Sequence, residues 1–245
     1  MSVEQPNPLQ KYFRQPSIYI KLPSAGRWWP EGTLEIPVMG EIGVYPMTTK
    51  DEITLRTPDA LLNGQGVVDV IHSCCPNIKD AWQMPSVDVD AVLIAIRVAS
   101  YGNSLNFEST CPHCREENVH EVDLGNLLGS VACPDYSQPI IHDTLKIKLH
   151  PQKYYTVNRT NQMAFEQEKL ENVLATTADV DPNIRAANLK DIVNRMVDIS
   201  MLAAAESTEY IETETGERVV DKNFITEFYS NADLGVSKEI QAKLV

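Results

Sequence analysis

A change in the spacing of apolar residues near Tyr155 constrains the fold of this chain more than any other feature. Before that point, residues 18–22 and 140–149 alternate apolar and polar side chains, a period typical of half-buried strands. After it, apolar residues recur every three or four positions over residues 161–176 and 182–207, as in amphipathic helices. The sequence therefore predicts an α+β fold, with a small N-terminal sheet and helices followed by a mostly helical C-terminal part.

The same patterns divide the chain into three parts. Residues 1–15 are polar, contain two prolines and are predicted to form an N-terminal arm, because proline interrupts a helix. Residues 16–155 form the α+β domain, which carries a Cys-x-x-Cys hairpin. Residues 156–245 form a helical region with a short acidic hairpin at residues 210–220. We expect the two long helices of this region to pack antiparallel.

Local signals place further elements in the α+β domain. Residues 33–37 and 43–46 flank a Met-Gly turn and predict a hairpin. Thr49 with Glu52 three residues later predicts a capping box at a helix start. Thr57 followed by proline predicts the start of another short helix.

The strongest predicted helix of this domain spans residues 86–100. Its body is apolar on nearly all sides, so we expect it to be the central buried helix. Ser86 or Asp88 is expected to cap its N-terminus, because both side chains accept hydrogen bonds from free amides.

The sharpest chemical signal is the segment Cys111-Pro112-His113-Cys114, at the tip of a hairpin predicted for residues 105–124. Two thiolates two residues apart at a turn can face one metal ion, as they do in zinc ribbons and knuckles. The motif therefore predicts half of a structural zinc site.

A tetrahedral zinc ion takes four nitrogen or sulfur donors. The remaining ligands are expected from Cys74 or Cys75 and from Cys133, with three histidines as alternative donors: His72, His113 and His120. Two other interpretations of the cysteines stay open, namely buried free thiols and a redox dithiol, although the latter is typical of a strand-to-helix context.

Charge and motif content exclude several functional classes. The formal net charge is -13 at pH 7 with no cluster of Lys and Arg, which argues against nucleic-acid binding. The longest apolar run, residues 91–96, is too short for a membrane span, and the N-terminus lacks a secretory signal, which predicts residence in a reducing cytoplasm. We find no catalytic constellation, so we expect neither an enzyme nor a small-molecule substrate.

Two adjacent tryptophans are the best candidates for an interface. Trp28 and Trp29 follow a turn, an arrangement that directs one ring inward and one outward, and an exposed Trp is a frequent interface anchor. The alternative is that both rings fold beneath the N-terminal arm.

Over roughly residues 12–128, this order of motifs resembles the base plate protein family of T-even-type contractile-tailed bacteriophages. The matching stretches are SIYIKLPSAGRWW from Ser17, EIPV from Glu35, GVYPMTTKDEITLRTPDALLNG from Gly43, VIHSCCPNIKD from Val70, VDVDAVLIAIRVASYGNS from Val87, CPHC from Cys111 and EVDL from Glu121. The helical remainder, including residues 210–228, is similar to longer members.

The resemblance implies a non-enzymatic tail component of the base plate hub or of hub assembly. Its partners would be other hub and tail proteins, including the tape-measure protein, and it would reside in the virion base plate and, during assembly, in the host cytoplasm. It also implies that a cysteine equivalent to Cys74 or Cys75 accompanies Cys111 and Cys114. Two alternatives remain: an assembly chaperone absent from the mature virion, and a metal-dependent or redox enzyme.

Overall fold

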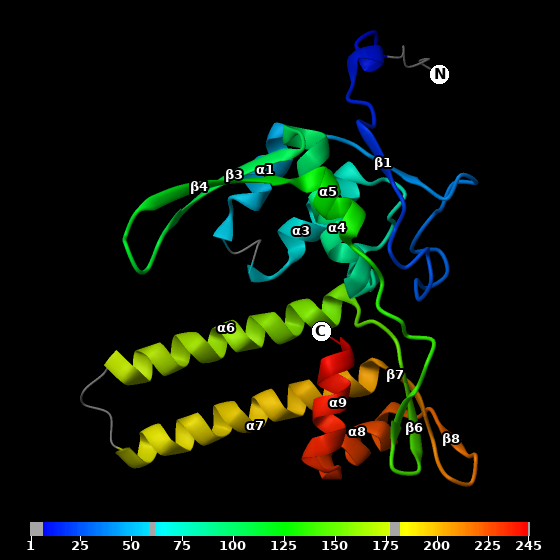
Figure 1. The fold of residues 1–245 in the computed structure, drawn as a ribbon, viewed down its shortest axis with the longest axis vertical. Helices are drawn as coiled ribbons and strands as arrows, with labels where there is room; N and C mark the ends of the chain where they lie inside the picture. The colour runs from blue at the N-terminus through cyan, green and yellow to red at the C-terminus, as the bar shows by residue number, and fades with distance from the viewer. Residues whose placement is uncertain (1–6, 59–61, 177–181, 245) are drawn as a thin grey trace, which may run out of the picture. The chain divides into compact units, whose positions relative to one another are not determined.

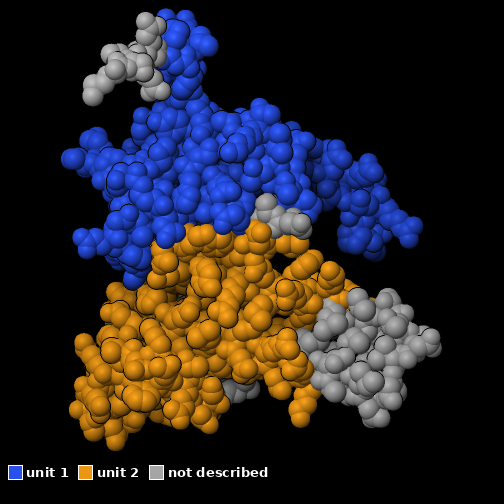
Figure 2. Space-filling model, turned by 180° about the vertical axis from the view of Figure 1, so that it is seen from behind, with its two compact units in different colours: residues 1–61, 65–81, 88–132 blue, residues 62–64, 82–87, 133–245 orange. Residues whose placement is uncertain are grey.

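The structure is a computed structural model that describes residues 7–58, 62–176 and 182–244. The chain forms two compact units, coloured separately in Figure 2. Unit 1 contains residues 1–61, 65–81 and 88–132, and unit 2 contains residues 62–64, 82–87 and 133–245.

Unit 1 begins with a short 3-10 helix and a two-stranded antiparallel sheet (Figure 1). The 3-10 helix η1 is Gln10–Tyr12, and strands β1 (Ile18–Ile20) and β2 (Ile42–Val44) pair with Ile18 opposite Val44. The hairpin predicted for residues 33–46 is therefore wrong. Residues 33–35 instead exchange backbone hydrogen bonds with residues 77–79, a non-local pairing that leaves β2 free to join β1.

Two helices follow the sheet in unit 1. Helix α1, Thr49–Leu55, begins with a capping box one residue earlier than predicted, because Thr48 and Asp51 form its two hydrogen bonds. Helix α3, Gln65–Cys74, directs Val68, Val70 and Ile71 into the core. The helix predicted after Thr57 lies partly outside the described residues.

Helix α4, Ser86–Tyr101, is the long helix that the apolar run predicted. Its side chains at Ala91, Val92, Ala95 and Ile96 are buried against the core of unit 1, as expected for the central helix. A 3-10 turn, Ala81–Gln83, precedes it.

The predicted cysteine hairpin is confirmed. Strands β3 (Ser104–Thr110) and β4 (Glu117–Asp123) pair antiparallel in unbroken register. Helix α5, Leu124–Ser130, follows and is capped by Asp123, whose carboxylate accepts the Asn126 amide.

Unit 2 contains a four-stranded antiparallel sheet in the order β5-β6-β7-β8. The strands are β5 (Ile140–His142), β6 (Leu145–Leu149), β7 (Thr208–Glu212) and β8 (Arg218–Val219). The β7-β8 pair is the predicted acidic hairpin. Two long helices separate β6 from β7 in the sequence, yet these strands are neighbours in the sheet.

Those helices are α6 (Tyr154–Thr176) and α7 (Pro182–Glu206), which lie side by side and antiparallel in Figure 1, as predicted. Helices α8 (Lys222–Asn231) and α9 (Leu234–Leu244) end the chain. The buried apolar side chains of this unit come from both its sheet and its helices: Ile147, Leu149, Ala203, Ala205, Ile211, Ile225, Tyr229, Val236 and Ile240.

The α+β class is confirmed, because small antiparallel sheets and separate helices make up both units. The division between the units differs from the predicted boundary at residue 155, since unit 2 already begins its main segment at Cys133. The physical reason is that β5 hydrogen-bonds to β6 and β6 hydrogen-bonds to β7, so both strands belong with the helical part.

Candidate functional site

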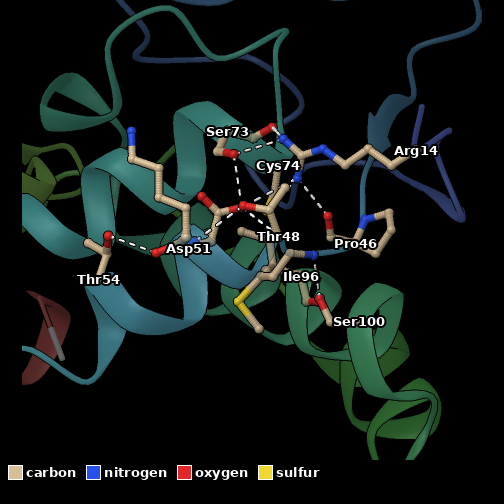
Figure 3. Close-up of polar contacts among 11 residues, drawn as sticks. Arg14, Pro46, Thr48, Asp51, Thr54, Ser73, Cys74, Ile96 and Ser100 are labelled. Atoms are coloured by element: carbon tan, nitrogen blue, oxygen red, sulfur yellow. Dashed lines mark hydrogen bonds and ion pairs between the residues drawn. The ribbon is translucent and has the colours of Figure 1, made fainter. Parts of the chain in front are cut away.

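The N-terminal arm is fixed to unit 1 by Arg14, shortly before β1 (Figure 3). One guanidinium nitrogen donates to the backbone carbonyl of Pro46 at 2.6 Å. The other donates to the carbonyl and the hydroxyl of Ser73 at 2.6 and 2.8 Å. Because the guanidinium presents its donors in fixed directions, this single side chain joins the arm to the end of α3 and to the loop before α1.

Asp51 completes the anchor from the first turn of α1. Its carboxylate lies 3.4 Å from Arg14 and accepts a hydrogen bond from the Ser73 hydroxyl at 3.0 Å (Figure 3). Burial acts to raise the pKa of Asp51, but hydrogen bonds from the Thr48 amide and hydroxyl, with those of Ser73 and the charge of Arg14, lower it overall. The carboxylate is therefore ionised near neutral pH and holds the arginine by charge as well as by geometry.

Beyond this anchor the arm exposes three large apolar side chains. Leu9, Tyr12 and Phe13 are 60%, 73% and 55% exposed. Leu9 is the residue that precedes η1, and the other two are the last residue of η1 and the one that follows it. Neighbouring exposed apolar residues on a tethered segment are typical of protein-binding elements. The arm predicted for residues 1–15 thus has a fixed end at Arg14 and an apolar surface before it.

An apolar groove lies on unit 1 next to the β1-β2 sheet. Its volume is about 480 Å³. Prolines and tyrosines dominate its lining, which consists of Pro16, Tyr19, Pro37, Met39, Glu41, Gly43, Tyr45, Pro76 and Asn77. Tyr19 and Met39 are exposed, so unit 1 presents a second apolar surface that can contact a partner.

The structure places the two adjacent tryptophans in different surroundings. The indole N–H of Trp29 donates to the buried carboxylate of Asp88 at 2.8 Å, so this ring is tied to α4. Trp28 is half-buried and has a φ of 65°. The guanidinium carbon of Arg27 lies over the Trp28 ring, 4.6 Å from the ring centroid. The interface role of both residues stays a prediction.

Cys111 and Cys114 lie at the β3-β4 tip, where Cys114 is exposed and Cys111 half-buried. The Arg115 amide donates to the Cys111 carbonyl at 2.8 Å, and the Cys111 amide donates to the Glu116 carbonyl at 2.9 Å. The pKa of the Cys111 thiol is lowered by hydrogen bonds from the backbone amides of Cys114 and His113. The turn therefore favours a thiolate, the form that binds metals.

The other cysteines have different environments. Cys74 and Cys75 are completely buried in unit 1, and burial raises their pKa to about 11 and about 12. Cys133 belongs to unit 2, where its thiol donates to the Pro134 carbonyl at 3.3 Å.

Among the described residues, no three His, Cys, Asp or Glu side chains lie close enough together to hold a metal ion. The structure thus does not bring Cys74 or Cys75 to the Cys111-Cys114 pair. The pair itself fits zinc in donor type and spacing, and the remaining ligands stay a prediction.

One polar cluster in unit 2 had no sequence signal. His142 on β5 lies 3.3 Å from the Asp233 carboxylate and 3.2 Å from the Glu239 carboxylate. Asp233 directly precedes α9, and Glu239 lies within it. Burial acts to lower the pKa of His142, but these two hydrogen bonds and charges raise it overall. The partners are more than 90 residues apart in the chain, so spacing alone does not connect them.

Comparison with known proteins identifies the family. The model of the T4 bacteriophage base plate protein family matches residues 16–245. The chain belongs to this family. The match includes both units, so it covers the resemblance expected over residues 12–128 and over the helical remainder, whereas most of the arm precedes it. No curated protein and no solved structure matches the chain.

Membership of the base plate family indicates a structural component of a T4-type phage tail base plate. It implies contacts with other base plate or tail proteins and a non-enzymatic role. In the part of the chain that the structure describes, no helix has the length and hydropathy needed to span a bilayer.

Proposed function

We propose that this base plate protein is a structural or assembly component of the base plate hub and acts through protein-protein contacts. Its partners are other hub and tail proteins, with the tape-measure protein among them. It works in the host cytoplasm during assembly and resides in the tail base plate afterwards.

The anchored arm carries this proposal. Arg14 and Asp51 fix one end of the arm, while Leu9, Tyr12 and Phe13 remain exposed before it. A tethered segment loses less conformational freedom on binding than a free one. Ordering the arm on binding therefore offsets little of its interaction free energy, and its apolar side chains can act as anchors in a partner's pocket.

A triple variant tests this role. Leu9→Ala, Tyr12→Ser and Phe13→Ser together remove the apolar surface and leave Arg14 in place. Because each anchor side chain contributes about 1 kcal/mol or more to binding, we expect the yield of infectious particles to fall at least roughly tenfold. The thermal melting of the purified protein should not change, because these side chains are exposed.

Gln10→Ala with Lys11→Ala is the matched control, since both residues are exposed in the same 3-10 helix. It should leave the yield unchanged. A triple variant that assembles base plates as well as the wild type would exclude the arm from the interface.

Mass spectrometry of purified virions tests residence in the particle. Peptides of this protein at a constant ratio to other base plate proteins are the expected result. Their absence from virions, together with their presence in base plate intermediates, would identify an assembly chaperone instead.

A further inference from the structure

The β3-β4 hairpin has very little apolar support. Only Leu105 and Val122 among its strand residues are half-buried, and every other residue of both strands is exposed. These two residues face one another near the base of the hairpin, and every strand residue in the half towards the tip is exposed. A two-stranded hairpin alone is marginally stable in water, which indicates that something else holds the tip.

The two faces of the hairpin differ in charge. Residues directly opposite one another share a face, and one face contains four carboxylates: Glu108, Glu117, Glu121 and Asp123. The other face contains no carboxylate and is formed by Leu105, Phe107, Ser109, Asn118, His120 and Val122. On this neutral face the Phe107 ring stacks on His120 with centroids 5.0 Å apart, and 47% of Phe107 is exposed.

The tip turn holds its cysteines in a defined arrangement. Arg115 adopts a φ of 61°, a left-handed conformation that a residue with a Cβ rarely adopts. This conformation closes the turn, in which the Arg115 amide donates to the Cys111 carbonyl at 2.8 Å and the Cys111 amide donates to the Glu116 carbonyl at 2.9 Å. The turn thus carries two sulfur donors, separated by two intervening residues, at the tip of the hairpin.

The described residues do not complete a set of four ligands around this pair. A structural zinc ion takes four ligands. The Glu116 carboxylate lies 3.8 Å from the Cys114 sulfur, but among the described residues no group of three His, Cys, Asp or Glu side chains could hold a metal ion. Cys74 and Cys75 are enclosed in the core and cannot reach the tip without unfolding it.

We propose that Cys111 and Cys114 bind one zinc ion together with the same two cysteines of a second copy, so that four thiolates from two hairpin tips complete the site. A second copy supplies two more sulfurs in the same turn, and a closed two-fold arrangement presents identical surfaces to one another. The neutral faces can approach without like-charge repulsion, whereas the acidic faces cannot. As the four Zn–S bonds form, the thiols release their protons to solvent.

The metal is essential to this pairing. One face of a short hairpin is far smaller than the roughly 800 Å² per partner that a stable interface buries. The contact between the neutral faces is therefore too weak to hold two copies alone, and the dimer should form only when zinc is bound. This inference is independent of the proposed hub role, because it concerns the purified protein alone.

The test uses the full-length protein under reducing conditions. Metal analysis after zinc loading and desalting should give about one zinc per two chains. Light scattering should detect a dimer with zinc and a monomer after chelation. Replacing zinc by Co²⁺ should give the sulfur-to-cobalt charge-transfer absorption of a site with four thiolates.

Cys114→Ser should abolish zinc binding and dimerisation, while the matched control Cys133→Ser should retain both. The chelated wild-type protein provides a second metal-free sample that does not depend on folding of the variant, and it should be monomeric with unchanged helical circular dichroism. One zinc per monomeric chain, no retained zinc, or a dimer that survives chelation would each overturn the proposal.

Discussion

Asp88 is a completely buried carboxylate that connects separate segments of unit 1. Its carboxylate has no exposed surface and accepts three hydrogen bonds. The Ser24 amide donates at 2.7 Å, the Ser24 hydroxyl at 2.5 Å and the Trp29 indole at 2.8 Å. The carboxylate thereby holds the turn after β1 and the tryptophan segment against α4. The sequence analysis expected Ser86 or Asp88 to cap this helix, and the hydrogen bonds of Asp88 go to Ser24 and Trp29.

The hydrogen bonds of Asp88 determine how much Asp88→Ala should lower the free energy of unfolding. Removing the carboxylate leaves the two Ser24 donors buried without an acceptor, at about 1–3 kcal/mol each. The half-buried Trp29 adds less, and removing a buried charge offsets part of the loss. We expect a decrease of about 3 kcal/mol in the unfolding free energy of unit 1. Asp88→Asn should cost less than Asp88→Ala but still about 1–3 kcal/mol, because its amide oxygen replaces one carboxylate oxygen while its NH2 group faces a donor that the other oxygen accepted.

The pH dependence provides an independent check. Burial raises the pKa of Asp88 above its ordinary value of 3.8, although the hydrogen bonds from Ser24 and Trp29 oppose this shift. The folded state then binds the proton more tightly than the unfolded state. Its unfolding free energy must therefore fall as the pH rises from 3.8 through the folded pKa, and the deficit persists above it. Asp88→Asn should lack this contribution.

Urea unfolding followed by tryptophan fluorescence measures these changes. In a Trp82→Phe background the emission comes from Trp28 and Trp29, which both lie in unit 1. Asp90→Ala is the control, since Asp90 is exposed on the same helix, and it should change the unfolding free energy by less than about 0.5 kcal/mol. If Asp88→Ala costs no more than Asp90→Ala, the buried network does not stabilise unit 1 and the reasoning is refuted.

Two further predictions concern α1 and α9. Thr48→Ala should lower the unfolding free energy by about 1 kcal/mol because it removes the N-cap of α1, whereas the exposed Thr49→Ala should have little effect; equal losses would contradict the observed cap. The pKa of His142 is raised by Asp233 and Glu239 in spite of its partial burial, so its stabilisation of α9 is complete below the ordinary value of 6.5 and is lost as the pH rises through the folded value. Amide exchange over residues 234–244 should therefore accelerate with pH beyond its intrinsic dependence, and His142→Gln should remove this excess.

Elements formed by residues close in sequence were predictable. Helix α4 is formed by hydrogen bonds between residues a few positions apart, and its apolar run made it recognisable. The strands on both sides of the cysteine turn pair with one another, and their alternating pattern predicted this. Register in such a hairpin follows from the turn, so β3 and β4 need no information from elsewhere in the chain.

Pairings between distant segments were not predictable in the same way. Residues 33–37 alternate as a strand does, yet their backbone groups pair with residues 77–79, and β2 pairs with β1. Periodicity identifies a segment that can pair but not its partner. The same limitation explains the boundary at residue 155, since the partner of β6 is β7, beyond two long helices.

Arg14 also lacked a signal, because an arginine in a polar segment is ordinarily solvated. Its role comes from the convergence of Pro46, Asp51 and Ser73, which three separate elements bring together. The effect of this convergence is to turn an otherwise ordinary polar segment into a tethered arm.

The cysteines illustrate best what residue type can and cannot reveal. The sequence alone does not distinguish the five thiols as metal donors, so the zinc prediction included all of them as candidate ligands. Burial separates them, because it raises the pKa of Cys74 and Cys75 and thereby makes their thiolates costly, whereas backbone amides at the hairpin tip favour the Cys111 thiolate. Under the proposed arrangement the other two thiolates come from a second copy, so one explanation accounts for both the exposed hairpin tip and the pair of cysteines that it carries.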